Sequence, residues 1–179
     1  MDVVSVKLAC ELPAHLAGEM RSNHAGETGA VWIYKGILTF SQDEEVCAFA
    51  KAHLKTEQQH LAFFDEWLTR RQKSLLLPVW RLSGFLLGAI AAVGSRTWVY
   101  ASIEAVETFV VTHYESQFAA LDLYGDAALS QQIQQFCADE GDHRNEATRA
   151  VTEKSRWLRA WCWLVGFGSA KAVRVARKL

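Results

Sequence analysis

The chain has 179 residues, half of them hydrophobic, and its formal net charge is −1. That length fits one domain of ordinary size, and that composition supplies enough apolar side chains for a sizeable core. Only two prolines occur, and no segment alternates apolar and polar residues as an exposed strand does. The sequence therefore excludes a β architecture and predicts an all-α protein with a single domain spanning 1–179.

The cysteines do not form a metal-binding motif. None belongs to a Cys-x-x-Cys pair, so neither a rubredoxin-type iron centre nor a zinc ribbon is encoded. We expect reduced thiols in a cytosolic compartment at all four positions, Cys10, Cys47, Cys137 and Cys162. The first 13 residues lack a basic segment followed by an apolar one, so we expect no secretory signal.

The first predicted helix covers about 13–41 and presents one acidic residue, Glu27, on its core-facing side. The other residues on that side are Leu16, Met20, Asn23, Val31, Tyr34 and Leu38. Small residues flank Glu27: Ala25, Gly26, Gly29 and Ala30. They fit close packing against another helix and also leave room beside a metal ion, and the two interpretations are compatible.

The second predicted helix covers about 42–72, and the acidic residues in its first turn suit the helix dipole. Its apolar stripe, from Val46 to Leu68, is interrupted at helical spacing by Glu57 and His60. His53 lies one turn before Glu57, and we expect it at the edge of the core or just outside a ligand set.

The third predicted helix, about 78–95, contains an apolar run from Leu82 to Gly94. This run is shorter than the roughly 20 residues that span a bilayer. One interpretation is a buried crossover helix. The stretch from Trp67 to Ile103 has no acidic residue and carries several arginines and tryptophans, which favours a helix that lies in a membrane interface.

The fourth predicted helix, about 97–123, carries Glu104 and Glu107 one turn apart. Either could be a metal ligand, but Glu107 fits the apolar stripe better. His113 and Tyr114 follow, and we regard both as candidate catalytic residues; Tyr114 faces either the metal and substrate or the core. The fifth predicted helix, about 127–153, brings Glu140 and His143 onto another apolar stripe.

The last predicted helix, about 156–179, is amphipathic and basic. It contains tryptophans on its apolar side, and no acidic residue occurs from Lys154 to the end. A basic amphipathic helix indicates a membrane-surface or partner-binding element. Near an anionic surface each basic residue contributes about 1 kcal/mol of attraction.

Two Glu-x-x-His steps are the strongest signal in the sequence, because residues i and i+3 share one face of a helix. Each step follows a lone glutamate, 30 residues after Glu27 in one half and 33 residues after Glu107 in the other. Charged groups rarely occupy a core face unless they are paired or bound to metal. An internal salt-bridge cluster is the alternative, but the core-facing positions offer almost no lysine or arginine.

This set of ligands is typical of a carboxylate-bridged di-iron or di-manganese site in a helix bundle. The gap from His60 to Glu107 is 47 residues, which leaves room for a long crossover through the third helix. We therefore predict a ferritin-like four-helix bundle with two additional amphipathic, interfacial helices.

Several motifs together resemble those of the demethoxyubiquinone hydroxylases, in order and over nearly the whole chain. They are Arg21-Ser22-Asn23-His24-Ala25-Gly26-Glu27-Thr28-Gly29-Ala30, His53…Glu57-x-x-His60-Leu61, Leu77-Pro78-Val79-Trp80…Gly84-Phe85-x-x-Gly88, Ala105-Val106-Glu107…His113-Tyr114 and Glu140-x-x-His143. Thr108 departs from the pattern, because many members have a second glutamate there.

The resemblance implies a ferritin-like di-iron monooxygenase of ubiquinone biosynthesis that hydroxylates 2-polyprenyl-3-methyl-6-methoxy-1,4-benzoquinol with O2. It implies two iron ions per chain, bridged by Glu57 and Glu140. The six ligands carried over by motif are Glu27, Glu57, His60, Glu107, Glu140 and His143.

The resemblance also sets expectations about partners and location. It implies a peripheral protein on the cytoplasmic face of a bacterial inner membrane, or on the matrix face of the mitochondrial inner membrane. The quinol itself, NADH or another reductant would supply electrons, and no Gly-x-Gly-x-x-Gly fingerprint for NADH is present. A homo-oligomer or a ubiquinone-biosynthesis complex is consistent with this interpretation; nucleic acid is not an expected partner.

Three other functions compete with this interpretation. A ferroxidase or iron-storage bundle would not need interfacial helices. Another di-iron hydroxylase, such as one acting on a modified tRNA base, would need a basic face near the site, whereas the basic residues here accompany tryptophans in amphipathic helices. A membrane-surface or lipid-carrier protein without catalysis would leave the six core-facing ligands unexplained.

Overall fold

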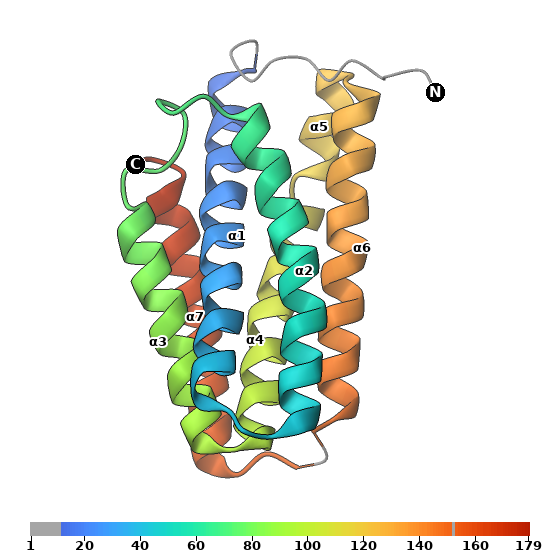
Figure 1. Cartoon of the computed structure of the whole chain (residues 1–179). Helices are drawn as coiled ribbons and strands as arrows, with labels where there is room; N and C mark the ends of the chain where they lie inside the picture. Colours follow the sequence, from blue (N-terminus) through green and yellow to red (C-terminus); the bar gives the residue numbers. More distant parts are fainter. Residues whose placement is uncertain (1–11, 152) are drawn as a thin grey trace.

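The structure is a computed structural model, and it describes residues 12–151 and 153–179. Cys10 and the segment considered above for a secretory signal fall outside the described residues, apart from its last two positions. The described part is helical between short loops, which confirms the all-α prediction (Figure 1). Its helices are α1 (Ala14–Phe40), α2 (Glu44–Trp67), α3 (Leu77–Gly94), α4 (Arg96–Glu115), α5 (Phe118–Tyr124), α6 (Ala127–Arg149) and α7 (Arg156–Ala176).

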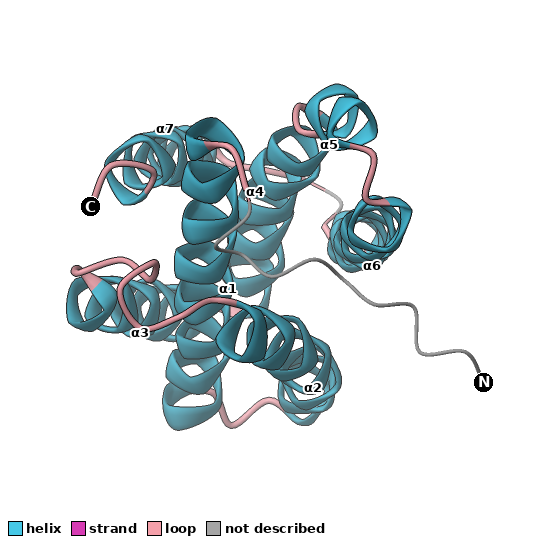
Figure 2. Ribbon diagram, turned by 90° about the horizontal axis from the view of Figure 1, so that it is seen from above, coloured by secondary structure: helices cyan, strands magenta, loops and turns pink. Residues whose placement is uncertain are grey.

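Four long helices form the bundle. The helix α1 packs against α2, and α4 packs against α6, while α3 lies outside against α1 and α7 lies outside against α4 (Figure 2). The helix α3 is the crossover that joins the two halves, as expected for the ferritin-like topology.

Two apolar clusters fill the bundle above and below its middle. One contains Ile37, Phe49 and Ile103, and the other contains Leu16, Phe64 and Ile133. Burying one side chain of this size contributes about 1.5–3 kcal/mol. Because Glu27 lies between Leu16 and Ile37 on α1, the polar residues of the bundle are held between two well-packed cores.

The helices α1 and α3 approach closely through glycines. A Cβ atom on Gly36 would lie 2.2 Å from Phe85 O, and one on Gly88 would lie 2.0 Å from Ile33 O. No real Cβ tolerates such contacts, so only glycine allows these two backbones to touch. This arrangement places one face of α3 firmly on α1 and leaves the opposite face exposed.

The fourth predicted helix, 97–123, is wrong as one continuous element, because it breaks after Glu115. The Ser116 hydroxyl and the side-chain amide of Gln117 both donate to the His113 carbonyl oxygen, at 2.7 and 3.1 Å. The Gln117 backbone N–H bonds instead to Tyr114 O. In a continuous α-helix the His113 carbonyl would accept from the Gln117 backbone N–H. Two side chains take that place, so α4 ends and a new helix, α5, begins at Phe118.

The second helix is also shorter than the predicted 42–72. It ends at Trp67, and the residues that follow form a loop fastened to the C-terminus. Arg21 donates to Gln72 O and to Arg177 O, and Leu75 N–H donates to Leu179 O. This loop leads into α3 and fixes the end of α7 beside α1.

Candidate metal centre

The six predicted ligands meet in the middle of the bundle. Each has at most 6% of its surface exposed. Their donor atoms form two groups, in each of which all atoms lie within 4.8 Å of one another: Glu27, Glu57, His60 and Glu140 in one group, and Glu57, Glu107, Glu140 and His143 in the other. The predicted bridging residues, Glu57 and Glu140, belong to both groups.

Helical spacing explains why the two pairs converge. On α2 the Glu57 carboxylate and the His60 ring share one face, and on α6 Glu140 and His143 do the same. The His60 Nδ1 atom lies 3.1 Å from a Glu140 oxygen, and His143 Nδ1 lies 3.1 Å from a Glu57 oxygen. Each imidazole therefore faces the carboxylate of the opposite helix.

Several of these oxygens are buried without a hydrogen-bond donor. Within the described residues, Glu27 Oε2, both oxygens of Glu57 and Glu140 Oε2 accept no hydrogen bond. Buried carboxylate oxygens without donors are costly unless a cation binds them. The donor set of oxygens and imidazole nitrogens suits iron or manganese, so this cluster could bind a metal ion.

The protonation of the metal-free cluster follows from its crowding. Burial, together with the neighbouring charge of Glu140, raises the pKa of Glu57 and of Glu107 well above the ordinary value. Burial lowers the pKa of His60, but the neighbouring carboxylates of Glu140 and Glu27 outweigh this effect and raise the pKa to about 12. Protons therefore balance part of the charge that a metal ion would balance.

Other residues hold the ligands from outside. The Tyr114 hydroxyl donates to Glu27 Oε1. Asp139 Oδ2 lies 3.1 Å from His60 Nε2, which we call the outer nitrogen of this ring because Nδ1 faces the cluster. The buried His53 ring packs against His143, with centroids 4.0 Å apart. The contact of Asp139 was not predicted, although Asp139 directly precedes Glu140 in the sequence.

The two glutamates of α4 have different surroundings. Glu107 is buried in the cluster, whereas Glu104 is paired with Lys154 Nζ at 2.5 Å and lies outside it. The neighbouring Thr108 is exposed and donates to Glu104 O. The departure at Thr108 therefore does not touch the candidate centre.

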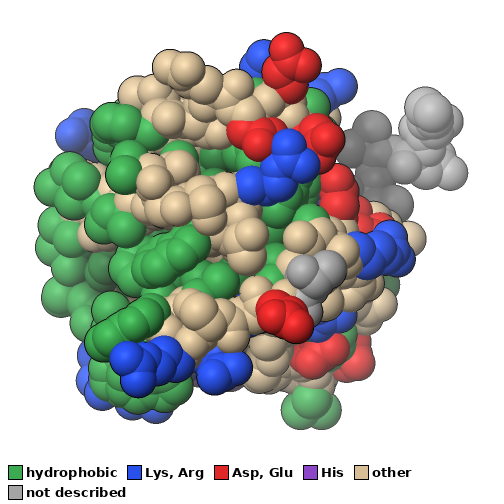
Figure 3. Space-filling model, turned by 90° about the horizontal axis from the view of Figure 1, so that it is seen from below, with side chains coloured by type: hydrophobic (Ala, Val, Ile, Leu, Met, Phe, Trp, Pro, Cys, Tyr) green, Lys and Arg blue, Asp and Glu red, His purple; other side chains and the backbone are tan. Residues whose placement is uncertain are grey.

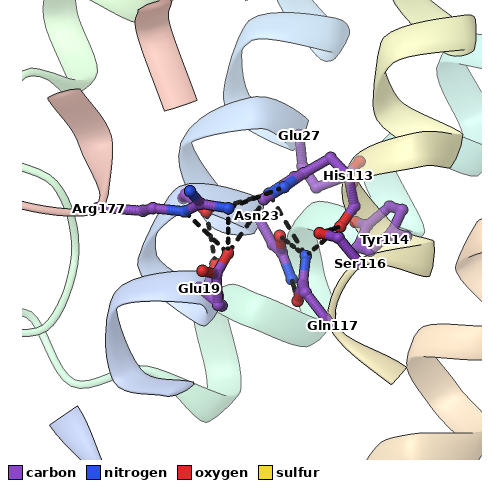
Figure 4. A network of polar contacts seen from close by, with 9 residues as sticks. Glu19, Asn23, Glu27, His113, Tyr114, Ser116, Gln117 and Arg177 are labelled. Atoms are coloured by element: carbon purple, nitrogen blue, oxygen red, sulfur yellow. Dashed lines mark hydrogen bonds and ion pairs between the residues drawn. The ribbon is translucent and has the colours of Figure 1, made fainter. Parts of the chain in front are cut away.

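The other candidate catalytic residue, His113, belongs to a polar network that also contains Tyr114 and Glu27 (Figure 4). Its Nε2 atom lies 3.1 Å from Ser22 Oγ, and Arg177 lies 3.4 Å from its Nδ1 atom. Glu19 pairs with Arg177 at 2.9 Å. Burial and the Arg177 charge lower the pKa of His113 to about 4, so this imidazole is neutral at pH 7.

An apolar channel of about 620 Å³ leads to the cluster. Its walls come from α1, α3, α4 and α7, and its inner end reaches Glu27, Glu57, Tyr114 and His113. The helices α3 and α7 flank the channel on opposite sides, and neither packs extensively on the other (Figure 2).

Exposed apolar side chains lie on both flanking helices. They are Leu82, Leu86, Ile90 and Val93 on α3, and Trp157, Trp163, Leu164 and Phe167 on α7. Figure 3 shows hydrophobic side chains gathered on the side of the molecule where these helices lie. By length and composition alone, α3 is the one helix among the described residues that could cross a membrane.

A helical bundle with two overlapping carboxylate–histidine groups in its core defines the class: a carboxylate-rich helical bundle whose centre could bind metal. Residues 14–176 match the family model described as ubiquinone biosynthesis protein COQ7, and the chain belongs to this family. The predicted resemblance is thereby confirmed.

Named relatives agree with the family assignment. The chain is 28% identical over 164 residues to the NADPH-dependent 3-demethoxyubiquinone 3-hydroxylase, mitochondrial, of Dictyostelium discoideum, covering 89% of this chain and 76% of that protein. It is 31% identical over 155 residues to the protein of the same name from Rattus norvegicus, covering 80% and 71%. It is 34% identical over 131 residues to the 3-demethoxyubiquinol 3-hydroxylase of Rhodospirillum rubrum, covering 70% and 60%.

Proposed function

We propose that this chain is a di-iron monooxygenase that hydroxylates the ring of a demethoxyubiquinol, 2-polyprenyl-3-methyl-6-methoxy-1,4-benzoquinol, in ubiquinone biosynthesis. The main support is that the two donor groups lie at the inner end of an apolar channel. A quinol ring with a long hydrocarbon tail fits such a channel, with the ring at the carboxylates and the tail directed toward the surface.

The donor groups divide naturally between two iron ions per chain. Glu27 and His60 would hold one ion, Glu107 and His143 would hold the other, and the two shared glutamates would bridge them. Bound there, the pair of ions supplies the redox capacity needed to reduce O2.

The protein's own residues position the reactants. The Tyr114 hydroxyl holds Glu27 in place, and the neutral His113 ring forms part of the channel wall without adding charge beside the quinol. One oxygen atom of O2 is inserted into a ring C–H bond to give a hydroxyl group, and the other leaves as water after taking up two electrons and two protons. The quinol or a reduced nicotinamide nucleotide supplies these electrons; the relatives from Dictyostelium and rat are named NADPH-dependent.

The location that best suits this reaction is a membrane surface. Exposed apolar side chains border the channel on α3 and α7, and basic residues such as Lys171 and Arg174 lie on α7 among them. The polyprenyl tail can then remain in lipid while the ring enters the bundle. We propose peripheral attachment to the cytoplasmic face of a bacterial inner membrane, or to the matrix face in a mitochondrion.

A single-turnover experiment tests the reaction. The protein is loaded with Fe(II) without oxygen, given the demethoxyquinol in detergent micelles and exposed to ¹⁸O2, and the product is weighed by mass spectrometry. We expect one labelled oxygen in the ring. Oxidised iron with unchanged quinol would overturn the proposal and favour a ferroxidase.

Blocking the channel tests its role separately. Gly26 lines the channel next to Glu27, and a Cβ atom there would meet no atom within 4 Å, so we expect Gly26→Leu to narrow the channel without moving the bundle. We expect a loss of hydroxylation of at least tenfold with iron content retained. Gly166→Leu is the matched control, because Gly166 is equally free of contacts but does not line the channel.

A further inference from the structure

The candidate metal centre is built from two similar half-chains. The lone glutamates lie on α1 and α4, and the Glu-x-x-His pairs lie on α2 and α6. The likeness extends beyond the ligands, because a buried tyrosine follows each lone glutamate by seven residues: Tyr34 follows Glu27, and Tyr114 follows Glu107. The donor set is therefore nearly the same for both metal positions.

This likeness ends at the residue before each paired glutamate. The first half has Thr56 before Glu57, and the second half has Asp139 before Glu140. Asp139 reaches across to the other half, where its Oδ2 lies 3.1 Å from the outer nitrogen of His60, and its Oδ1 accepts a hydrogen bond from Gln135. The outer nitrogen of His60 is thereby held by a carboxylate.

His143 has no equivalent partner. Its ion-pair contacts with Glu57 and Glu140 are both made by Nδ1. Among residues 12–151 and 153–179, no carboxylate contact within 4 Å is made by its outer nitrogen, Nε2. Its other neighbour is the ring of His53, which itself bonds to Glu146 at 3.0 Å. One imidazole is thus oriented by a carboxylate and the other by ring packing.

A carboxylate on the outer nitrogen fixes the tautomer and orientation of a metal-binding histidine and makes it a stronger ligand. Removal of such a partner typically weakens metal binding 10- to 100-fold. We propose that the two metal positions are unequal, that the position at Glu27 and His60 fills first, and that Asp139 is the positioning residue that sets this order. This inference rests on the proposed di-metal centre.

Stepwise metal titration tests the order directly. Metal-depleted protein is titrated with Co(II), and heat and the visible Co(II) absorption bands are followed together. We expect two steps whose dissociation constants differ at least tenfold. His60→Ala should remove the tight step and His143→Ala the weak one, which assigns each step to a position.

The role of Asp139 is tested by a graded pair of variants. Asp139→Ala should weaken the tight step 10- to 100-fold and leave the weak step unchanged. Asp139→Asn should recover part of that loss, because its amide oxygen can still accept from the ring. Asp142→Asn is the matched control, because Asp142 is exposed on the same helix and should leave both steps unchanged. Circular dichroism checks that each variant is folded.

The possible failures are distinguishable. Two bound ions with equal affinities, or a tight step that survives Asp139→Ala, would overturn this inference and leave the di-metal centre standing. Failure of the wild-type protein to bind two ions would overturn the proposed centre itself.

Discussion

The carboxyl group of Glu27 is buried inside the bundle and depends on a tyrosine from the opposite half of the chain. Tyr114 supplies the hydrogen bond to its Oε1 atom, while Oε2 has no donor. At the scale of single residues, the site is therefore held by a few contacts whose removal leaves a buried acceptor unsatisfied.

Replacing Tyr114 with phenylalanine should lower the free energy of unfolding of the metal-free protein by about 1–3 kcal/mol, because a buried carboxylate oxygen loses its only donor. Urea unfolding followed by circular dichroism measures the change. Tyr100→Phe is the control, since Tyr100 is also buried but its hydroxyl bonds to none of the six ligands. Equal effects in the two variants would contradict the assigned role.

The protonation of the cluster predicts how stability depends on pH. The pKa values of Glu57 and Glu107 are raised by burial and by neighbouring carboxylates, and the pKa of His60 is raised to about 12 by the carboxylates of Glu140 and Glu27, against the effect of burial. Above pH 7 the folded metal-free protein thus keeps the His60 proton, which the unfolded chain has released. Its stability should fall as the pH rises from 7.5 to 9.

The slope should be about 1.4 kcal/mol per pH unit for each such proton. Histidines with a lowered pKa, such as His113, are largely neutral in both states over this range and contribute little. Urea unfolding at pH 7.5, 8.25 and 9 measures the slope, and saturating metal should flatten it by displacing the protons. A flat profile without metal would show that the folded cluster has already released these protons.

At the scale of elements, the contact between α1 and α3 is the most restrictive in the fold. Gly88→Ala would place a methyl group 2.0 Å from Ile33 O and force the two helices apart. We expect a loss of at least 2 kcal/mol of stability, measured by thermal unfolding. Gly166→Ala on α7 meets no atom within 4 Å and should be neutral or stabilising by up to about 1 kcal/mol.

Helical periodicity was enough to predict most elements and the inward direction of the six candidate ligands. What it could not predict depends on contacts between distant residues. The break after Glu115 arises where Gln117 pairs with Asn23, 94 residues away, as well as with the His113 carbonyl. The different surroundings of Glu104 and Glu107 likewise depend on a distant residue, because Lys154 pairs with Glu104. Periodicity predicts which face of a helix points into the core, but not which distant residue contacts that face.

At the scale of the whole molecule, apolar side chains on α3 and α7 surround the entrance to the channel. If they enter lipid, each contributes about 1.5–3 kcal/mol. The double variant Leu164→Ser and Phe167→Ser should therefore reduce binding to anionic phospholipid vesicles at least tenfold in a sedimentation assay. Leu123→Ser is the control, since Leu123 is 90% exposed but belongs to α5, away from the channel. Equal losses in the variants would indicate nonspecific adsorption.

The helices α3 and α7 pack little on one another, and for the proposed enzyme at a membrane surface we expect a kinetic consequence. A substrate that enters sideways from a bilayer is encountered in two dimensions, and its supply is set by its mole fraction among the lipids. Diluting the vesicles with buffer should then leave the turnover rate unchanged, whereas diluting the quinol with additional phospholipid should lower it. The effective Michaelis constant of such an enzyme is a mole fraction of quinol in the membrane. A value expressed in moles per litre would vary with the amount of lipid in the assay.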